Sequence, residues 1–257
     1  MKPQIWLIGG TSDSKAIALA LLAGQIPLVV TVTSRVTLYP SEVKVIVGKM
    51  DQALMESFCK QQAVAAIVDA SHPYATEVSR QAILVATRLN IPYLRYERSS
   101  YQPSSIMAEQ AKIIDLDSFE TLLAGDYLTH HRVMLTVGCQ ILPQFQPWQG
   151  RATLYARVLP RLSSVEIALA AGFTSDRLIA LRPPITMNLE MALWQQWQIS
   201  LVVTKASGIS GGEDIKQQAA AKLGIPIIVV QRPPVVYHRQ TSSLSETLAY
   251  CRGIIAT

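Results

Sequence analysis

The stretch Ile5-Trp6-Leu7-Ile8-Gly9-Gly10-Thr11-Ser12-Asp13-Ser14 decides which fold we expect for this 257-residue chain. Four apolar residues end at two glycines, and apolar side chains then recur at helical spacing in Ala16, Leu19, Ala20 and Ala23. This pattern predicts a buried strand, a tight turn and an amphipathic helix. Glycine lets a ligand approach the backbone closely. The free N–H groups at the start of a helix favour a phosphate there.

The turn matches the G-x-G-x-x-G fingerprint of dinucleotide-binding proteins only in part, because Ser14 stands where the third glycine belongs. Two interpretations of this stretch therefore stay open. It is either a phosphate-binding turn of a nucleotide-binding domain or an ordinary connection between a strand and a helix.

Composition narrows the function classes. Apolar residues make up 49% of the chain and charged residues 16%, which is typical of a well-packed globular protein of one large or two small domains. No apolar stretch reaches the roughly 20 residues of a membrane helix, and the N-terminal apolar run is too short for a signal peptide. The net charge of +5 indicates an anionic partner. Because the basic residues are scattered, we expect an acidic small molecule and neither nucleic acid nor membrane.

Cysteine and histidine usage points to a cytoplasmic protein without a metal site. Cys59, Cys139 and Cys251 are isolated and form no C-x-x-C motif or disulfide framework, which suits a reducing compartment. The four histidines show no metal-ligand spacing. We expect a monomer or a small homo-oligomer.

Apolar runs and helical patterns alternate along the whole chain, which predicts parallel sheets covered by helices on both faces. The expected strands are 5–8, 27–32, 43–47, 65–69, 93–96, 133–136, 153–158, 177–181, 201–204 and 227–230. The expected helices are the one that follows Gly10 and 51–62, 76–90, 163–171, 187–197, 214–223 and 244–252.

The fold class that follows is α/β, with two Rossmann-like domains whose sheets are mostly parallel. The polar, Pro-containing stretch at about 99–111 is the expected linker, which places the domains at 1–98 and 112–257. An exchange of one element between the C-terminal half and the first domain stays open. We expect the active site in the cleft between the domains, because ligands of open α/β sheets bind outside the carboxyl ends of the strands.

A faint internal repeat relates the two halves. A shift of 134 positions aligns Ser71 with Lys205, Leu89 with Leu223 and Arg98 with Arg232. Each half then contains a strand, a polar loop, a helix, an x-Ile-Pro connection and a further strand. The alternative is that Leu-x-Ile-Pro is a common connection from a helix to a strand.

Two loops at expected strand ends carry candidate functional residues. Residues 205–213, Lys-Ala-Ser-Gly-Ile-Ser-Gly-Gly-Glu, place backbone N–H groups and one lysine where they can hold an anion. Residues 69–74, Asp-Ala-Ser-His-Pro-Tyr, place His72 at a strand end, where it can donate a hydrogen bond or relay a proton. The alternatives are a solvent-exposed glycine loop and a histidine that caps backbone groups.

The end of the second expected strand bears on cofactor choice. Rossmann-type sites that select NAD place an acid there, whereas sites that select NADP tend to offer an arginine to the 2′-phosphate. Here Thr33 and Ser34 precede Arg35 and no acid is present. Arg35 is therefore the candidate for the 2′-phosphate, and a solvated arginine is the alternative.

These stretches resemble the precorrin-6A reductase family of cobalamin biosynthesis, including its cobalt-precorrin-6A reductases. The most specific segments are Asp-Ala-Ser-His-Pro-Tyr-Ala at 69–75 and Lys-Ala-Ser-Gly at 205–208. The others, which occur in the family's order and cover nearly the whole chain, are Ile-Gly-Gly-Thr at 8–11, Pro-Tyr-Leu-Arg-Tyr-Glu-Arg at 92–98, Thr-Val-Gly at 136–138 and Ala-Arg-Val-Leu-Pro at 156–160.

The resemblance implies two Rossmann-like domains and an NADPH-dependent oxidoreductase. Such an enzyme reduces one double bond of the macrocycle in precorrin-6A or cobalt-precorrin-6A and gives the 6B form. Its partner is an anionic, tetrapyrrole-derived small molecule, in agreement with the basic charge of the chain. Two alternatives stay open, namely another NADP-dependent α/β oxidoreductase and a non-catalytic NADP-sensing module.

The residues expected to carry this function fall into three groups. The catalytic candidates are His72 and Lys205, and the proton donor stays open between His72 and bound water. The cofactor candidates are Gly9, Gly10, Thr11, Ser12, Asp13, Thr33, Ser34 and Arg35. The substrate candidates are Ser71, Tyr74, Arg95, Arg98, Ser207 and Gly208.

Overall fold

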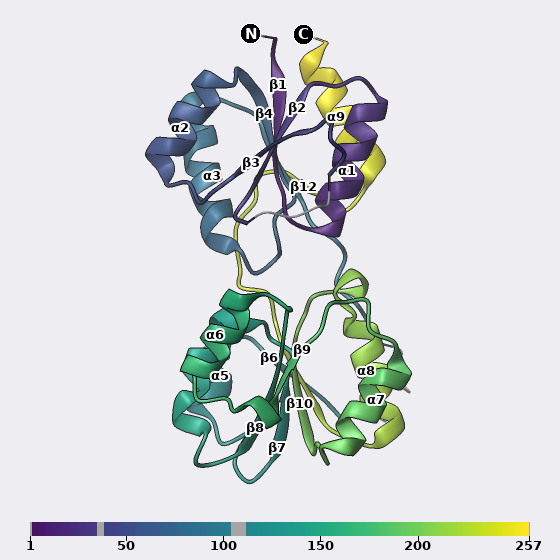
Figure 1. The fold of residues 1–257 in the computed structure, drawn as a ribbon. Coiled ribbons are helices and arrows are strands. Elements are labelled where there is room, and N and C mark those ends of the chain that lie inside the picture. Colours follow the sequence, from purple (N-terminus) through teal and green to yellow (C-terminus); the bar gives the residue numbers. More distant parts are fainter. Residues whose placement is uncertain (1, 35–38, 104–111, 257) are drawn as a thin grey trace. The chain divides into compact units, whose positions relative to one another are not determined.

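The chain folds into two compact units in a computed structural model that describes residues 2–34, 39–103 and 112–256. The first unit consists of Met1–Ser99 together with Pro233–Thr257, and the second of Ser100–Arg232. Each unit is a sheet covered on both faces by helices (Figure 1). The expected α/β class with two domains is confirmed.

The sheet of the first unit is parallel throughout and has the order β3-β2-β1-β4-β5-β12. Its strands are β1 (Gln4–Ile8), β2 (Leu28–Val32), β3 (Lys44–Val47), β4 (Val64–Asp69), β5 (Tyr93–Tyr96) and β12 (Gln240–Thr241). The central strands are apolar on both faces because both faces are covered. The order 3-2-1-4-5-6 is that of dinucleotide-binding sheets, whose ligands bind at the switch point between the first and fourth strands.

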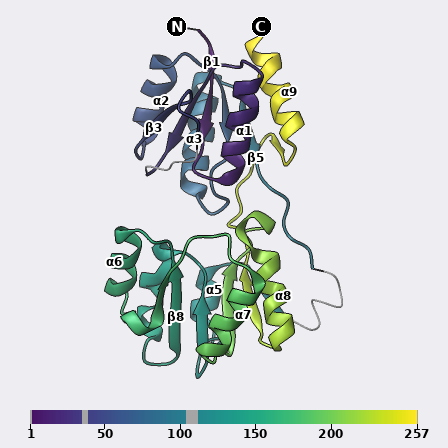
Figure 2. The same ribbon diagram turned by 45° about the vertical axis from the view of Figure 1, so that its right-hand side comes forward.

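Helices cover both faces of this sheet (Figure 1). On one face lie α1 (Ser12–Ala23) and α9 (Leu244–Ile255), which run beside each other in Figure 2 as well. Their apolar residues pack with Ile5, Leu7 and Val68 in one core. On the other face lie α2 (Gln52–Gln61) and α3 (Thr76–Leu89), which enclose a second core around Trp6 and Ile67.

The second unit repeats this plan with the sheet order β6-β11-β10-β7-β8-β9, again parallel. Its strands are β6 (Ile113–Leu116), β7 (Arg132–Leu135), β8 (Thr153–Val158), β9 (Leu178–Ala180), β10 (Leu201–Lys205) and β11 (Ile227–Val230). Its helices are α5 (Phe119–Ala124), α6 (Leu162–Ala170), α7 (Met187–Gln196) and α8 (Glu213–Leu223), with 3₁₀ segments η1 (Cys139–Trp148), η2 (Ser175–Arg177) and η3 (Ile209–Gly211).

The two units exchange their last strands. When β7 is counted as the first strand of the second unit, the order is again 3-2-1-4-5-6, and β6 takes the sixth place although it comes first in sequence. In the first unit the sixth place belongs to β12, which follows β11 of the other unit. In each unit the chain therefore leaves after the fifth strand and supplies the sixth strand of the other unit.

This exchange corrects the boundary of the second domain, which the sequence placed at 112–257. Residues from Pro233 onward belong to the first unit. The physical reason is that β12 pairs with β5, and that α9 buries Thr247 and Cys251 against the α1 face of the first sheet. Without α9 part of that apolar face would be exposed to water.

The remaining expected elements lie within a few residues of those observed. The sequence did not predict β6, α5, η1 or β12, which are short or, in the case of η1, contain two prolines. Among the described residues, no helix is long and apolar enough to cross a membrane. Within the same residues, no group of three or more His, Cys, Asp or Glu side chains is placed to hold a metal ion.

Candidate active site

The turn after β1 is built to present backbone N–H groups. Gly10 has a φ of +103°, in the region that favours glycine. Thr11 and Ser14 form a reciprocal capping box, in which the Ser14 N–H donates to Thr11 Oγ1 (3.1 Å) and the Thr11 N–H donates to Ser14 Oγ (3.0 Å). The first-turn N–H groups of Ser12 and Asp13 have no acceptor among the described residues. Ser14 stands at the position of the third glycine of the fingerprint, and there it takes part in capping the helix.

Tyr39 supports this turn, and the sequence did not point to it. Its hydroxyl accepts a hydrogen bond from the Gly10 N–H (2.8 Å) and lies 2.7 Å from Ser14 Oγ. Because Ser14 Oγ donates its proton to the Thr11 carbonyl, Tyr39 is the donor to Ser14. A Cβ atom at Gly9 would collide with the Tyr39 hydroxyl, so the phenol also accounts for the glycine at position 9.

Two predicted ligand residues pair with each other. Arg98 Nη2 lies 2.7 Å from Asp13 Oδ2, and both side chains are largely buried. Asp13 lies in the first turn of α1, where the helix dipole favours a carboxylate. The ion pair joins the start of α1 to the segment after β5, and neither charge is left uncompensated for a ligand.

The loop after β4 is anchored by a buried carboxylate. Asp69 is fully buried and accepts four hydrogen bonds. At Oδ1 the donors are the Ser71 N–H (2.9 Å) and Arg95 Nη1 (3.0 Å). At Oδ2 the donors are Ser79 Oγ (2.5 Å) and Tyr93 Oη (2.7 Å). Burial, reinforced by Asp69, raises the pKa of Tyr93 above its ordinary value, so the phenol is a stable donor.

This network corrects the expected role of Arg95. The side chain is 1% exposed and was expected to bind substrate. Its guanidinium instead contacts Asp69, Ser71 Oγ (3.1 Å) and Glu97 Oε2 (2.9 Å), and lies over the ring of Tyr237. Arg95 is therefore part of the core beneath the loop. Ser71 is also buried, and its hydroxyl accepts a hydrogen bond from Arg95.

His72 is exposed and its ring is oriented by its own loop. The Tyr74 N–H donates to His72 Nδ1 at 3.2 Å, so this nitrogen is an acceptor and the neutral ring carries its proton on Nε2. The rings of His72 and Tyr74 lie 5.8 Å apart. The hydrogen bond from the Tyr74 N–H thus fixes the direction of the His72 ring within its loop.

A cavity of about 510 Å³ joins these motifs within the first unit. It is lined by the segments that follow β1, β2, β3 and β4, which meet at one edge of the parallel sheet. The predicted residues that line it are Gly9, Gly10, Thr11, Thr33, Ser71, His72 and Tyr74. The sequence missed Lys49, which also lines it, because this lysine belongs to no motif. Arg35 lies outside the described residues.

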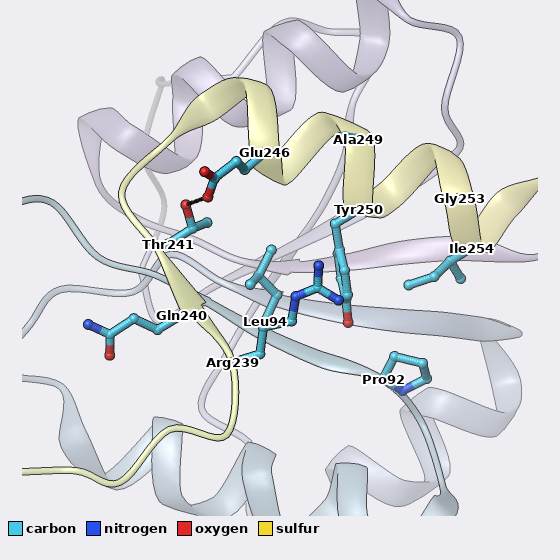
Figure 3. Close-up of a pocket in the computed structure, with 10 residues that line it drawn as sticks. All are labelled: Pro92, Leu94, Arg239, Gln240, Thr241, Glu246, Ala249, Tyr250, Gly253 and Ile254. Carbon is cyan, nitrogen blue, oxygen red and sulfur yellow. Dashed lines mark hydrogen bonds between the residues drawn. The ribbon is translucent and has the colours of Figure 1, made fainter.

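A second cavity of about 590 Å³ lies at the far edge of the same sheet (Figure 3). It is bounded by α9, β12 and the start of β5, and Arg239, Glu246 and Tyr250 are among its lining residues. None of the residues predicted to bind cofactor or substrate lines this cavity.

In the second unit, Lys205 ends β10 and its ammonium group lies 5.6 Å from the centre of the Phe119 ring. Burial lowers the pKa of Lys205 to about 8, and the nearby Cys139 acts weakly in the opposite direction. Lys205 is thus still mostly protonated at pH 7, but far more easily deprotonated than an ordinary lysine.

The glycine loop after Lys205 is held by side chains of α8. The Gly208 N–H donates to Glu213 Oε2 (2.7 Å), and Lys216 Nζ donates to the carbonyls of Gly211 and Gly212 (both 2.9 Å). This corrects the expectation that Gly208 offers its N–H to an anion, because that donor already has a carboxylate acceptor. The next residue back, Ser207, is also mostly buried.

The strand order of the first unit is that of the dinucleotide-binding α/β proteins. The start of α1 lies beside a cavity at the switch point, as expected for this class. The chain belongs to the family described as precorrin-6x reductase CbiJ/CobK, whose model matches residues 4–252. It is therefore an oxidoreductase of cobalamin biosynthesis that reduces a double bond of a corrin-precursor macrocycle, and the resemblance read from the sequence is confirmed.

Similar proteins agree with this placement. The chain is 43% identical to the cobalt-precorrin-6A reductase of Synechocystis over 96% of its length and 95% of the relative. It is 33% identical to the cobalt-precorrin-6A reductase of Priestia megaterium over 95% of its length and 96% of the relative. The solved structure of CobK precorrin-6A reductase shares the fold with a TM-score of 0.81 at 20% identity, over 98% of this chain and 97% of that one.

Proposed function

We propose that this chain uses NADPH to reduce cobalt-precorrin-6A to its 6B form. The observation that carries the proposal is the cavity of the first unit, which brings the Gly-Gly-Thr turn and the His72 loop together at the switch point. Support for the cobalt-containing substrate comes from the two relatives above, both of which are named for it.

The residues around the cavity fit a dinucleotide. The N–H groups of Ser12 and Asp13 at the start of α1 offer two donors to the diphosphate, and Gly10 keeps side-chain atoms out of its approach. The partly buried side chain of Met50, which lines the cavity, offers an apolar surface for the adenine ring. The cofactor, when bound, supplies the hydride.

The His72 loop is proposed to position the macrocycle at the cofactor end of the cavity. The Nε2–H of the neutral ring is a donor for a carboxylate or for a polarised ring nitrogen of the substrate. Asp69 and Arg95 beneath the loop hold the backbone of residues 69–71, so the direction of His72 is set before substrate binds.

Lys205 is proposed to hold a substrate carboxylate or to supply the proton that follows hydride transfer. A pKa of about 8 suits an acid at neutral pH, because the ammonium form predominates and its proton is readily lost. The basic charge of the chain also favours a substrate that carries several carboxylates.

The test is NADPH oxidation by the purified protein with cobalt-loaded and metal-free substrate side by side. We expect turnover with the cobalt form at a kcat/KM at least tenfold higher than with the metal-free form. Equal turnover would contradict the substrate assignment, and turnover with NADH alone would contradict the cofactor assignment.

A further inference from the structure

The choice between NADPH and NADH depends on which positive charge reaches the 2′-phosphate of the adenosine ribose. In the strand order of the first unit, that ribose is expected beside the carboxyl end of β2, whose outer neighbour is β3. The inference therefore rests on the proposed NADPH site and names one residue that recognises the 2′-phosphate of this cofactor.

Lys49 lies in the right place for this role. The Gly48 N–H donates to the Val32 carbonyl (2.9 Å), which fixes the segment after β3 against the end of β2. Thr33 and Lys49, the residues that follow this contact on the two strands, both line the cavity. Lys49 therefore borders the cavity in which the dinucleotide is proposed to bind.

The charge of Lys49 is available to a ligand. None of the ion pairs between described residues involves it. The nearest carboxylate in sequence, Asp51, caps α2 by accepting the Leu54 N–H at 2.9 Å. Lys49 is the one lysine or arginine among the described residues that line this cavity, and no acid stands at 33, 34 or 48–50 to favour an unphosphorylated ribose.

We propose that Lys49 binds the 2′-phosphate of NADPH and gives the enzyme its preference for NADPH over NADH. The sequence instead pointed to Arg35, which lies outside the described residues. The contact is a charge-assisted hydrogen bond at the mouth of the cavity, so its strength falls as the salt concentration rises.

The test uses nucleotides that differ only in the phosphate. Adenosine 2′,5′-bisphosphate and 5′-AMP are titrated calorimetrically into the wild type, Lys49→Met, Lys49→Arg and Arg35→Met. Lys60→Met, which removes one exposed charge from α2 of the same unit, is the matched control. We expect Lys49→Met to weaken the bisphosphate roughly ten- to a hundredfold and to leave 5′-AMP within about twofold. Lys49→Arg and Lys60→Met should keep the wild-type preference.

If Arg35→Met loses the preference for the bisphosphate over 5′-AMP while Lys49→Met keeps it, the inference is overturned and the phosphate is assigned to Arg35. Adenosine 2′,5′-bisphosphate and 5′-AMP that bind the wild type equally would also overturn it, while leaving an adenine-nucleotide site in place. A wild type that binds no adenine nucleotide would overturn both this inference and the proposed cofactor site. Because Lys49 is exposed, its replacement should leave the melting temperature unchanged, which separates lost recognition from lost folding.

Discussion

Asp69 and Arg95 form an ion pair of 3.0 Å in which neither side chain is more than 1% exposed. A charge pair this deeply buried is stable only when its remaining polar atoms are hydrogen-bonded. Here Ser71, Ser79 and Tyr93 each donate a hydrogen bond to the Asp69 carboxylate. The pair sits directly beneath the loop that carries His72. It therefore links the stability of the first unit to the geometry of the site.

Arg95→Met should destabilise the protein by about 3–5 kcal/mol, because it leaves Asp69 charged and buried without its cation. Urea denaturation measures the loss. Arg88→Met is the control, since it breaks the exposed pair with Glu56 and should cost less than about 1 kcal/mol. An Arg95→Met variant with normal stability and lost substrate affinity would show instead that Arg95 binds substrate.

Tyr39→Phe should weaken NADPH binding by about two- to tenfold, because the Gly10 N–H loses its acceptor and the turn is held less firmly. The enhancement of NADPH fluorescence on binding measures the dissociation constant. Tyr127→Phe in the second unit serves as the control. Tighter binding in Tyr39→Phe would show instead that the phenol competes with a phosphate oxygen for the Gly10 N–H.

Activity should fall as the pH rises through about 8, because the pKa of Lys205 is lowered to about 8 and the neutral amine neither binds a carboxylate nor donates a proton as an ammonium. Lys205→Met should lose roughly tenfold or more in kcat/KM at pH 7 and should lack this limb of the pH profile. Lys222→Met on the exposed end of α8 is the control. A limb near pH 8 that persists in Lys205→Met would assign it to another group.

The stability of the fold should rise with pH over a range in which activity falls. The folded-state pKa values of Lys205 and Lys216, both about 8, lie below the ordinary lysine value of 10.5. Between about pH 8 and 10.5 the unfolded chain therefore binds more protons, and these two groups raise the free energy of unfolding with pH. Chemical denaturation at pH 7.5 and 9.5 should show a smaller gain in Lys205→Met than in the wild type, and an equal gain would contradict the burial of this ammonium.

His72→Asn should keep much of the activity that His72→Ala loses. Asparagine offers an oxygen that can accept the Tyr74 N–H and an amide that can donate to the substrate, whereas alanine loses about 1–3 kcal/mol of positioning. Single-turnover hydride transfer from pH 5.5 to 8.5 compares the two variants. Equal collapse of both, with loss of a pH limb near the ordinary histidine pKa, would make His72 the proton donor.

Local patterns in the sequence were sufficient where a structure is specified by neighbours along the chain. The apolar run into Gly9 and Gly10 predicted β1, the turn and α1, because burial periodicity and backbone freedom are short-range properties. The internal repeat is likewise a feature that local sequence patterns were sufficient to predict. β5 and β11 begin 134 positions apart, at Tyr93 and Ile227, and α3 and α8 end 134 positions apart, at Leu89 and Leu223.

Tertiary structure alone decided the features that join distant parts of the chain. β12 has two residues and no apolar pattern, and it is a strand only because β5 offers it an edge. Arg95 was predicted to bind substrate because it lies in a segment that resembles the reductase family, whereas only the fold brings Asp69 within 3.0 Å to make the burial of Arg95 stable. Tyr39 and Lys49 belong to no motif, and only the fold brings Tyr39 against the turn after β1 and Lys49 to the cavity. A sequence records periodicity and residue type, whereas burial, pairing and shared cavities depend on contacts between residues that are far apart in the chain.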